Sequence, residues 1–151
     1  MSWQCDVRRL VPGEASVFHH LNELFAVAFG EAHKYQATKP TTAYLERLLQ
    51  MQHVIPLVAF ADGEIEGGLV AYELDKFEQE RREIYIYDLA VQEGYRRRGV
   101  ATALIAHLRE IARQHGAWVI YVQADYGDDP AIALYTKLGE REDVMHFDIS
   151  V

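Results

Sequence analysis

A run of arginines between a predicted strand and a predicted helix is the part of the sequence best suited to chemistry. Residues 96–98 are all arginine, and no acidic residue occurs between Glu93 and Glu110, although the whole chain has a formal charge of −8. Gly99 and Ala101 follow. Small residues let a ligand approach the backbone, and free N–H groups at a helix N-terminus attract anions. The segment therefore predicts a diphosphate site, with an ordinary solvated loop as the alternative.

A second polar cluster lies where a later strand is expected to give way to a helix. It consists of Asp125, Asp128 and Asp129, and such a junction is the usual mouth of a site in α/β folds. These carboxylates would suit a ligand with several ammonium groups. The alternative is a local role: Asp129 precedes Pro130 and is expected to cap the helix, while the other two satisfy turn backbone.

Hydrophobic patterning predicts the elements that position these clusters. Apolar residues at helical spacing predict helices at about 17–29, 42–49, 100–116 and 130–138. Extended patterns predict strands at about 3–10, 54–61, 64–74, 83–91, 118–122 and 144–149. We expect strand 83–91 to be the central strand and 118–122 to be buried. The order predicts an α/β fold with a mixed sheet and helices on both faces, with helix 100–116 starting at the C-terminal end of strand 83–91.

Length and composition limit the class of protein. The chain has 151 residues, half of them apolar, with ten glycines and four prolines, which predicts a single domain over 1–151. No apolar run reaches the about 18 residues of a membrane helix. One cysteine and no secretory signal predict a cytoplasmic protein, and the acidic charge argues against nucleic-acid and membrane partners. His19, His20 and Glu23 show no further ligand nearby, so no metal is expected.

Two motifs in order make the sequence resemble the GCN5-related N-acetyltransferase superfamily. Residues 95–101 read Tyr-Arg-Arg-Arg-Gly-Val-Ala, similar to the superfamily's acetyl-CoA signature [QR]-x-x-G-x-[GA]. Residues 131–139 resemble its second motif at the expected distance. More narrowly, class I aminoglycoside 3-N-acetyltransferases are similar at 76–79, 83–91, 121–130 and 145–148. The resemblance implies the single-domain acyl-CoA N-acyltransferase fold, with acetyl-CoA as cosubstrate.

The resemblance also assigns the coenzyme contacts. It implies that loop amides grip the diphosphate of coenzyme A and that a splayed strand pairs with the pantetheine arm. The strand residues are Leu89, Ala90 and Val91, and the loop residues are Arg96, Arg97, Arg98, Gly99, Val100, Ala101 and Thr102. The chain departs from most superfamily members at Asp128, where they carry Asn, and at Glu140, where they carry an aromatic residue.

Such a reaction needs two proton transfers. Tyr135, which without the resemblance is a core residue on a helix face, is expected to protonate the departing thiolate, because a phenol stays protonated at neutral pH. A carboxylate must accept the amine proton, because an ammonium has no lone pair. Glu83 and Asp88 are the candidates. Strict alternation places Glu83 with Tyr87 and Asp88 on the opposite face, but the bulge usual in this family would turn Asp88 inward, and we prefer Asp88.

The resulting prediction is an aminoglycoside 3-N-acetyltransferase that confers antibiotic resistance. The 3-amino group of 2-deoxystreptamine attacks the thioester directly, with strand amides near Leu89 donating to the carbonyl oxygen. The expected substrate contacts are Tyr87, Asp125, Asp128 and Asp129. The resemblance also suggests a homodimer. Two alternatives stay open: the same chemistry on a polyamine or peptide terminus, and a regulatory module that binds coenzyme A without turnover.

Overall fold

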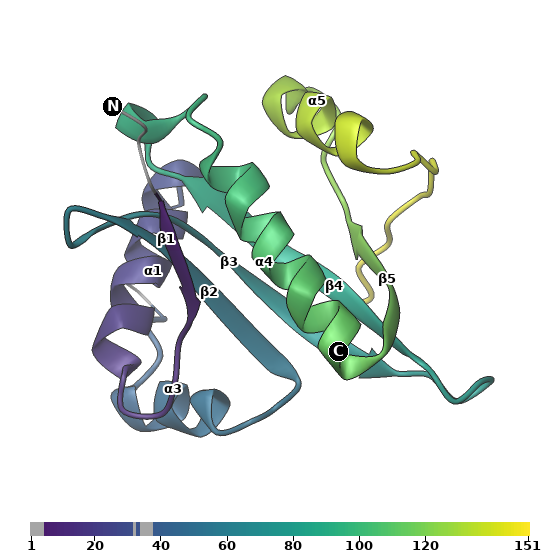
Figure 1. The fold of residues 1–151 in the computed structure, drawn as a ribbon, viewed down its shortest axis with the longest axis horizontal. Coiled ribbons are helices and arrows are strands. Elements are labelled where there is room, and N and C mark those ends of the chain that lie inside the picture. The colour runs from purple at the N-terminus through teal and green to yellow at the C-terminus, as the bar shows by residue number, and fades with distance from the viewer. Residues whose placement is uncertain (1–4, 32, 34–37) are drawn as a thin grey trace. The chain divides into compact units, whose positions relative to one another are not determined.

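The chain forms two compact units, Met1–Tyr121 and Val122–Val151. The computed structural model describes residues 5–31, 33 and 38–151, so the start of the first expected strand lies outside the described residues. The first unit contains the sheet with helices α1, α3 and α4, and the second contains helix α5 (Figure 1). The single domain over 1–151 stays a prediction.

The sheet of the described chain has five strands in the order of the sequence. β1 (Asp6–Arg9), β2 (Val54–Ala61), β3 (Glu64–Asp75) and β4 (Arg82–Val91) pair antiparallel, and β5 (Ala117–Val122) lies beyond β4 in a mixed sheet. The turn at Asp62 and Gly63 joins β2 to β3, with φ of 51° and 78°, the left-handed values that a two-residue hairpin turn requires. The hairpin is confirmed. The central position of strand 83–91 is wrong, because β3 is the middle strand.

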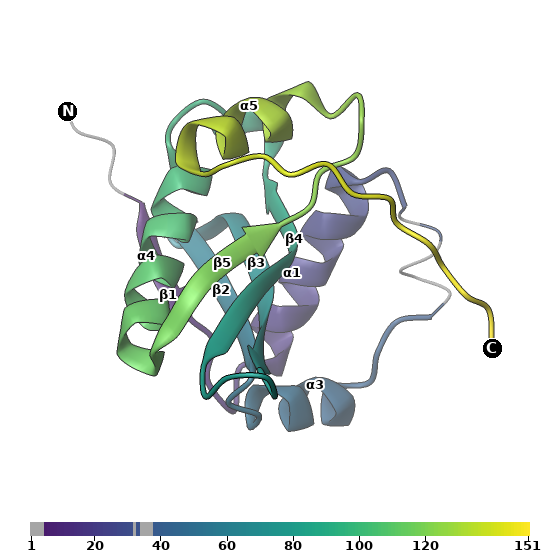
Figure 2. The same cartoon turned by 90° about the vertical axis from the view of Figure 1, so that its right-hand side faces the viewer.

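Helices cover both faces of the sheet, as predicted. α1 (Ala15–Ala28) and α4 (Val100–His115) lie on opposite sides of the strands (Figure 2). Adjacent residues of β3 show the same arrangement: a Cβ added at Gly68 would touch Leu21 of α1, and one at Gly67 would come within 3.0 Å of Val100 of α4. Neighbouring residues on a strand face opposite sides. None of the described helices is long and apolar enough to cross a membrane.

Local signals in the sequence account for the helix ends. α3 (Thr42–Leu49) begins after Thr41, whose hydroxyl oxygen accepts the N–H of Tyr44 at 3.1 Å. α4 ends at Gly116, where φ is 71°, a left-handed conformation that glycine adopts without a steric penalty. Both helix boundaries are therefore confirmed.

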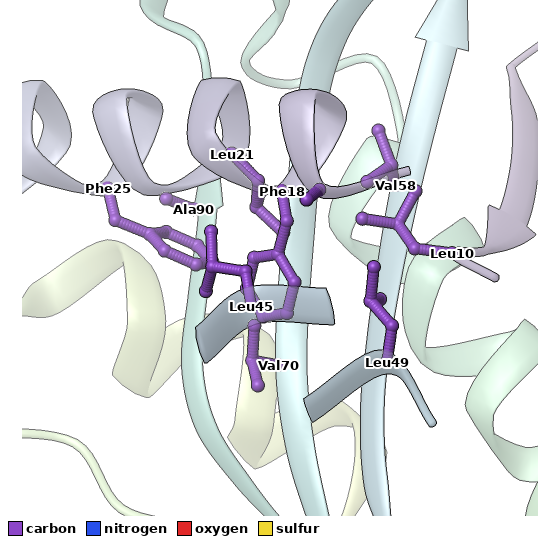
Figure 3. Packing of buried hydrophobic residues seen from close by; sticks show 10 residues of the cluster. Leu10, Phe18, Leu21, Phe25, Leu45, Leu49, Val58, Val70 and Ala90 are labelled. Atoms are coloured by element: carbon purple, nitrogen blue, oxygen red, sulfur yellow. The ribbon is translucent and has the colours of Figure 1, made fainter. Parts of the chain in front are cut away.

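One hydrophobic core cluster lies between α1, α3 and the sheet. Phe18, Leu21 and Phe25 of α1 point toward Leu45 of α3 and Val70 of β3 (Figure 3). All five side chains are buried. Burial of each large apolar side chain stabilises the fold by about 1.5–3 kcal/mol, so this cluster holds α1 and α3 firmly against the strands.

In the second unit, α5 (Asp129–Leu138) begins one residue earlier than predicted. The side chain of Asp128 accepts the N–H of Ala131 at 3.4 Å, and the N–H of Ile132 donates to the Asp128 carbonyl at 3.0 Å. Asp128 is therefore the N-cap, and the prediction that Asp129 caps the helix is wrong. The first helical hydrogen bond already starts at residue 128, which places Asp129 within the first turn.

Two strand predictions are also wrong near the C-terminus. Residues 140–151 contain no regular secondary structure, whereas a strand was expected at 144–149. A strand needs a neighbour for its backbone groups, and the sheet of the described residues has none for this segment. β5 was expected to be buried, but none of its residues is. As the last strand of that sheet, β5 has a neighbour on one side only.

Candidate active site

The predicted anion site is a turn between the end of β4 and the start of α4. A short 3₁₀ helix, η1 (Glu93–Tyr95), follows β4, and the chain then passes through left-handed conformations at Arg97 (φ 65°) and Gly99 (φ 81°). Gly99 is the N-cap of α4, and because glycine has no side chain, no cap hydrogen bond occupies the first amides of the helix. The buried side chain of Val100 anchors the first turn. The amide groups that begin the helix are thus available to an anion.

The arginines of this turn remain exposed and close to its backbone. Arg96 Nε donates to the Val91 carbonyl at 3.5 Å, and the guanidinium carbon of Arg98 lies 5.4 Å from the centre of the Tyr95 ring. These contacts hold positive charge beside the N-terminus of α4. Uncapped amides and guanidinium groups are the donors that a diphosphate prefers, so the segment fits the phosphorylated end of coenzyme A.

A bulge in β4 decides the orientation of the candidate base. Asp88 pairs with Val70 of β3, and Ile86 pairs with the next residue, Ala71, so Tyr87 is the extra residue of β4. Directly opposed residues of neighbouring strands share a face. Asp88 therefore shares the face of Val70, on the α1 side of the sheet. The predicted bulge is confirmed, and it turns Asp88 toward the face that carries Tyr87.

Tyrosines cover the same region of the sheet. Tyr87 makes edge contacts with Tyr72 and Tyr85 at centroid distances of 5.9 and 5.8 Å, and Tyr85 stacks on Tyr121 at 4.7 Å. Tyr87 is the most open of them, at 62% exposed. Sequence reasoning selected only Tyr87. The spacing of Tyr85 and Tyr87 could have indicated that both rings lie on one face of the strand. Tyr72 and Tyr121 reach this aromatic surface only because their strands are neighbours of β4.

The two candidate carboxylates occupy different environments. Asp88 is half-buried, and burial followed by the charge of Glu31 raises its pKa above the ordinary value. Glu83 lies 3.1 Å from Lys76 Nζ, and this hydrogen bond raises the pKa of the lysine. A carboxyl group whose pKa lies above the ordinary value is better suited to accept a proton near neutral pH. Asp88 stays the preferred candidate base, with Glu83 as the alternative.

The remaining predicted site residues belong to the second unit. Burial, together with the charge of Asp128, raises the pKa of Tyr135 to about 12. Asp125 and Asp128 share one turn, in which the Asp128 N–H donates to the Asp125 carbonyl at 3.2 Å. Asp125 and Asp129 are exposed. Asp128 caps α5, so one of the three predicted substrate carboxylates already holds the start of the helix.

No group of three or more His, Cys, Asp or Glu side chains within the described ranges could hold a metal ion. Of the histidine pair considered from the sequence, His19 contacts Thr42 through Nε2 and Oγ1 at 3.3 Å.

Comparisons with known proteins identify the family. Residues 16–139 match the model of the Acetyltransferase (GNAT) family. An aminoglycoside acetyltransferase from an uncultured soil metagenomic sample is 53% identical, with a TM-score of 0.95 over 98% of this chain and 99% of that one. Another from such a sample, solved in complex with sisomicin, is 29% identical, with a TM-score of 0.90 over 97% and 96% of the two chains.

Curated relatives match over a shorter length. The N-alpha-acetyltransferase of Sulfurisphaera tokodaii is 30% identical over 95 residues, which is 56% of this chain and 57% of the relative. The chain thus matches little more than half of the curated relative's length. The family match, in contrast, extends from α1 to the end of α5 and includes β4, residues 96–102 and Tyr135. The chain therefore belongs to the GNAT family of acetyltransferases, enzymes that use acetyl-CoA.

Proposed function

We propose that the protein acetylates an aminoglycoside, at the 3-amino group of its 2-deoxystreptamine ring. The observation that carries the substrate class is the 53% identity, over nearly the whole chain, to an aminoglycoside acetyltransferase. The 3-N position rests on the resemblance of 83–91 and 121–130 to class I enzymes. Such an activity would confer antibiotic resistance in the cytoplasm. A homodimer stays a prediction.

The turn before α4 would hold the coenzyme. The first amides of the helix, from Val100 to Thr102, would donate to the diphosphate, with the guanidinium groups of 96–98 beside them. The backbone of Leu89–Val91 would pair with the pantetheine arm. The coenzyme supplies an activated acetyl group, and the protein's contribution is to position it and to move two protons.

The tyrosine-covered face of β4 would receive the acceptor. The exposed ring of Tyr87 offers an aromatic surface to a sugar ring and to its ammonium groups. Asp88 on the same face would take the proton from the attacking amine, with Glu83 as the alternative base. In the second unit, Asp125, Asp128 and Asp129 would bind further ammonium groups, and Tyr135 would donate a proton to sulfur.

Thiol release with a substrate panel tests the function. With acetyl-CoA present, a thiol-reactive dye should report free coenzyme A when gentamicin-type or kanamycin-type aminoglycosides are added. NMR of the product should place the acetyl group on the 3-amino nitrogen. Faster turnover of spermidine or of an unblocked peptide would assign the acceptor to another amine class. Binding of acetyl-CoA without thiol release on any amine would favour the regulatory module.

The Asp88→Asn variant should lose about 10²-fold or more in kcat/KM, because general base catalysis contributes about 10²–10⁴-fold. Wild-type kcat/KM should fall as pH drops through the raised pKa of Asp88, at a pH above the ordinary carboxyl range. The acidic limb should flatten in Asp88→Asn. Glu83→Gln is the control, and a larger loss there than in Asp88→Asn would move the base to Glu83.

A further inference from the structure

Glu66 of β3 is a buried ionisable side chain that the proposed chemistry leaves unused. It is 0% exposed, and neither carboxyl oxygen has a hydrogen-bond partner among the described residues. Ile65 pairs with Phe60 and Gly67 with Ala59, so Glu66 is the extra residue at a bulge in the β2–β3 ladder. A carboxylate in such a place is unfavourable unless a positive charge or a proton neutralises it.

The backbone around Glu66 lies directly against the proposed coenzyme site. The Glu66 carbonyl accepts the N–H of Gln92, the first residue after β4, at 2.7 Å. A Cβ added at the neighbouring Gly67 would come within 3.0 Å of the side chain of Val100, the first residue of α4. The backbone of β3 at Glu66 and Gly67 therefore lies against both ends of the turn that would bind the diphosphate.

The groups that act on Glu66 come from three segments. Burial is the main cause that raises its pKa; Arg98, in the turn before α4, opposes the rise, and Asp62 of the β2–β3 turn adds to it. Burial raises the pKa of the Cys5 thiol, just before β1, and the charge of Glu66 adds to this rise. Arg98 is thus the one cation among the named groups that favours the ionised carboxylate.

A diphosphate bound to residues 96–102 would change this balance. Its negative charge would repel an ionised Glu66, and it would compete for Arg98, the group that stabilises the carboxylate. A protonated Glu66 is not repelled by the diphosphate and does not depend on Arg98. We propose that Glu66 takes up one proton from solvent when the diphosphate of acetyl-CoA binds beside it, which makes coenzyme affinity dependent on pH. This inference rests on the coenzyme site of the proposed function.

Linkage sets the direction of the effect. Binding favours the protonated acid, so the pKa of Glu66 is higher in the complex than in the free protein. Acetyl-CoA affinity should be greatest below the pKa of the free protein and should fall as pH rises, by up to about tenfold per pH unit, until the pKa of the complex is passed.

Calorimetry can measure the proton directly. Acetyl-CoA is titrated into wild type, Glu66→Gln and Glu64→Gln in two buffers with different heats of ionisation, from pH 5.5 to 8.5. Wild type should take up more protons than Glu66→Gln, and Glu66→Gln should bind more tightly than wild type at the alkaline end. Glu64→Gln makes the same charge change at an exposed position of β3 and should behave like wild type. The phosphate groups of the coenzyme titrate equally in all three experiments.

The outcomes separate the two proposals. Equal proton uptake by wild type and Glu66→Gln, with normal binding, would overturn the role of Glu66 and leave the coenzyme site standing. No binding of acetyl-CoA to wild type would overturn both. If Glu66→Gln does not fold, Glu66→Met supplies a second side chain of similar size that does not titrate. Without ligand, both variants should gain melting temperature over wild type more at pH 8 than at pH 5, because a raised carboxyl pKa destabilises the fold as pH rises.

Discussion

The Tyr135→Phe variant should lose about 10²- to 10⁴-fold in kcat, the range that general acid catalysis contributes, with acetyl-CoA affinity nearly unchanged. The physical reason is the proton on the phenol. Burial and the charge of Asp128 raise the pKa of Tyr135 to about 12, so the hydroxyl is protonated throughout the neutral range and can donate to a thiolate. Phenylalanine keeps the ring and removes only the hydroxyl group that carries this proton.

Steady-state rates with a thiol dye and calorimetry of acetyl-CoA binding measure the two quantities separately. Tyr126→Phe is the matched control, because it removes a hydroxyl from an exposed tyrosine of the same unit. That variant should retain most of the wild-type kcat. Equal losses of affinity and turnover in Tyr135→Phe would instead indicate that the hydroxyl serves binding or structure, since a purely catalytic proton acts in the transition state alone.

The Gly99→Val variant should raise the KM for acetyl-CoA about 10- to 100-fold, equivalent to about 1.4–2.8 kcal/mol of binding free energy. Gly99 has φ of 81°, and the left-handed region costs an L-residue about 1–2 kcal/mol, with β-branched side chains the worst case. No atom lies within 4 Å of a Cβ added there. The loss would therefore come from the altered turn and from a side chain facing the bound anion.

Gly94→Val provides a control in the same turn. A Cβ added at Gly94 also has no neighbour within 4 Å, and its φ is not in the left-handed region. The KM for acetyl-CoA should stay close to that of wild type, while kcat changes little in either variant, because lost ground-state binding raises KM alone. Equal increases in KM for both variants would show a general disturbance of the turn and would remove the special role of Gly99.

Structural features that depend only on residues close together in the sequence could be predicted from it. The Asp62-Gly63 turn, the cap at Thr41 and the glycine end of α4 depend on backbone angles and hydrogen bonds within a few residues. The turn before α4 is local in the same way, because its arginines, its glycine and the start of the helix are contiguous from 96 to 102. Its binding of an anion stays a prediction. In the second unit the local signal was ambiguous, because Asp128 and Asp129 are both good caps and Pro130 suits either position in the first turn.

Residues that act across strands were not predictable in the same way. Tyr72 and Tyr121 join the aromatic surface because β3, β4 and β5 are neighbours. The side of the sheet that Asp88 faces depends on a bulge at Tyr87, and one extra residue reverses the alternation of every side chain beyond it. The sequence raised this possibility through a family resemblance, but the pairing of Asp88 with Val70 was needed to establish it.

The amino-acid sequence by itself determined the order of the elements up to α5 and the glycine turn that begins α4, because these features arise from short-range backbone preferences and hydrophobic periodicity. The family followed from the two motifs at 95–101 and 131–139, which lie within the family match. Only the tertiary structure decided which face of the sheet Asp88 shares, which tyrosines form one surface, and that the buried Glu66 has no hydrogen-bond partner among the described residues. Register, bulges and burial depend on segments far apart in the chain, and no local pattern of residues encodes them.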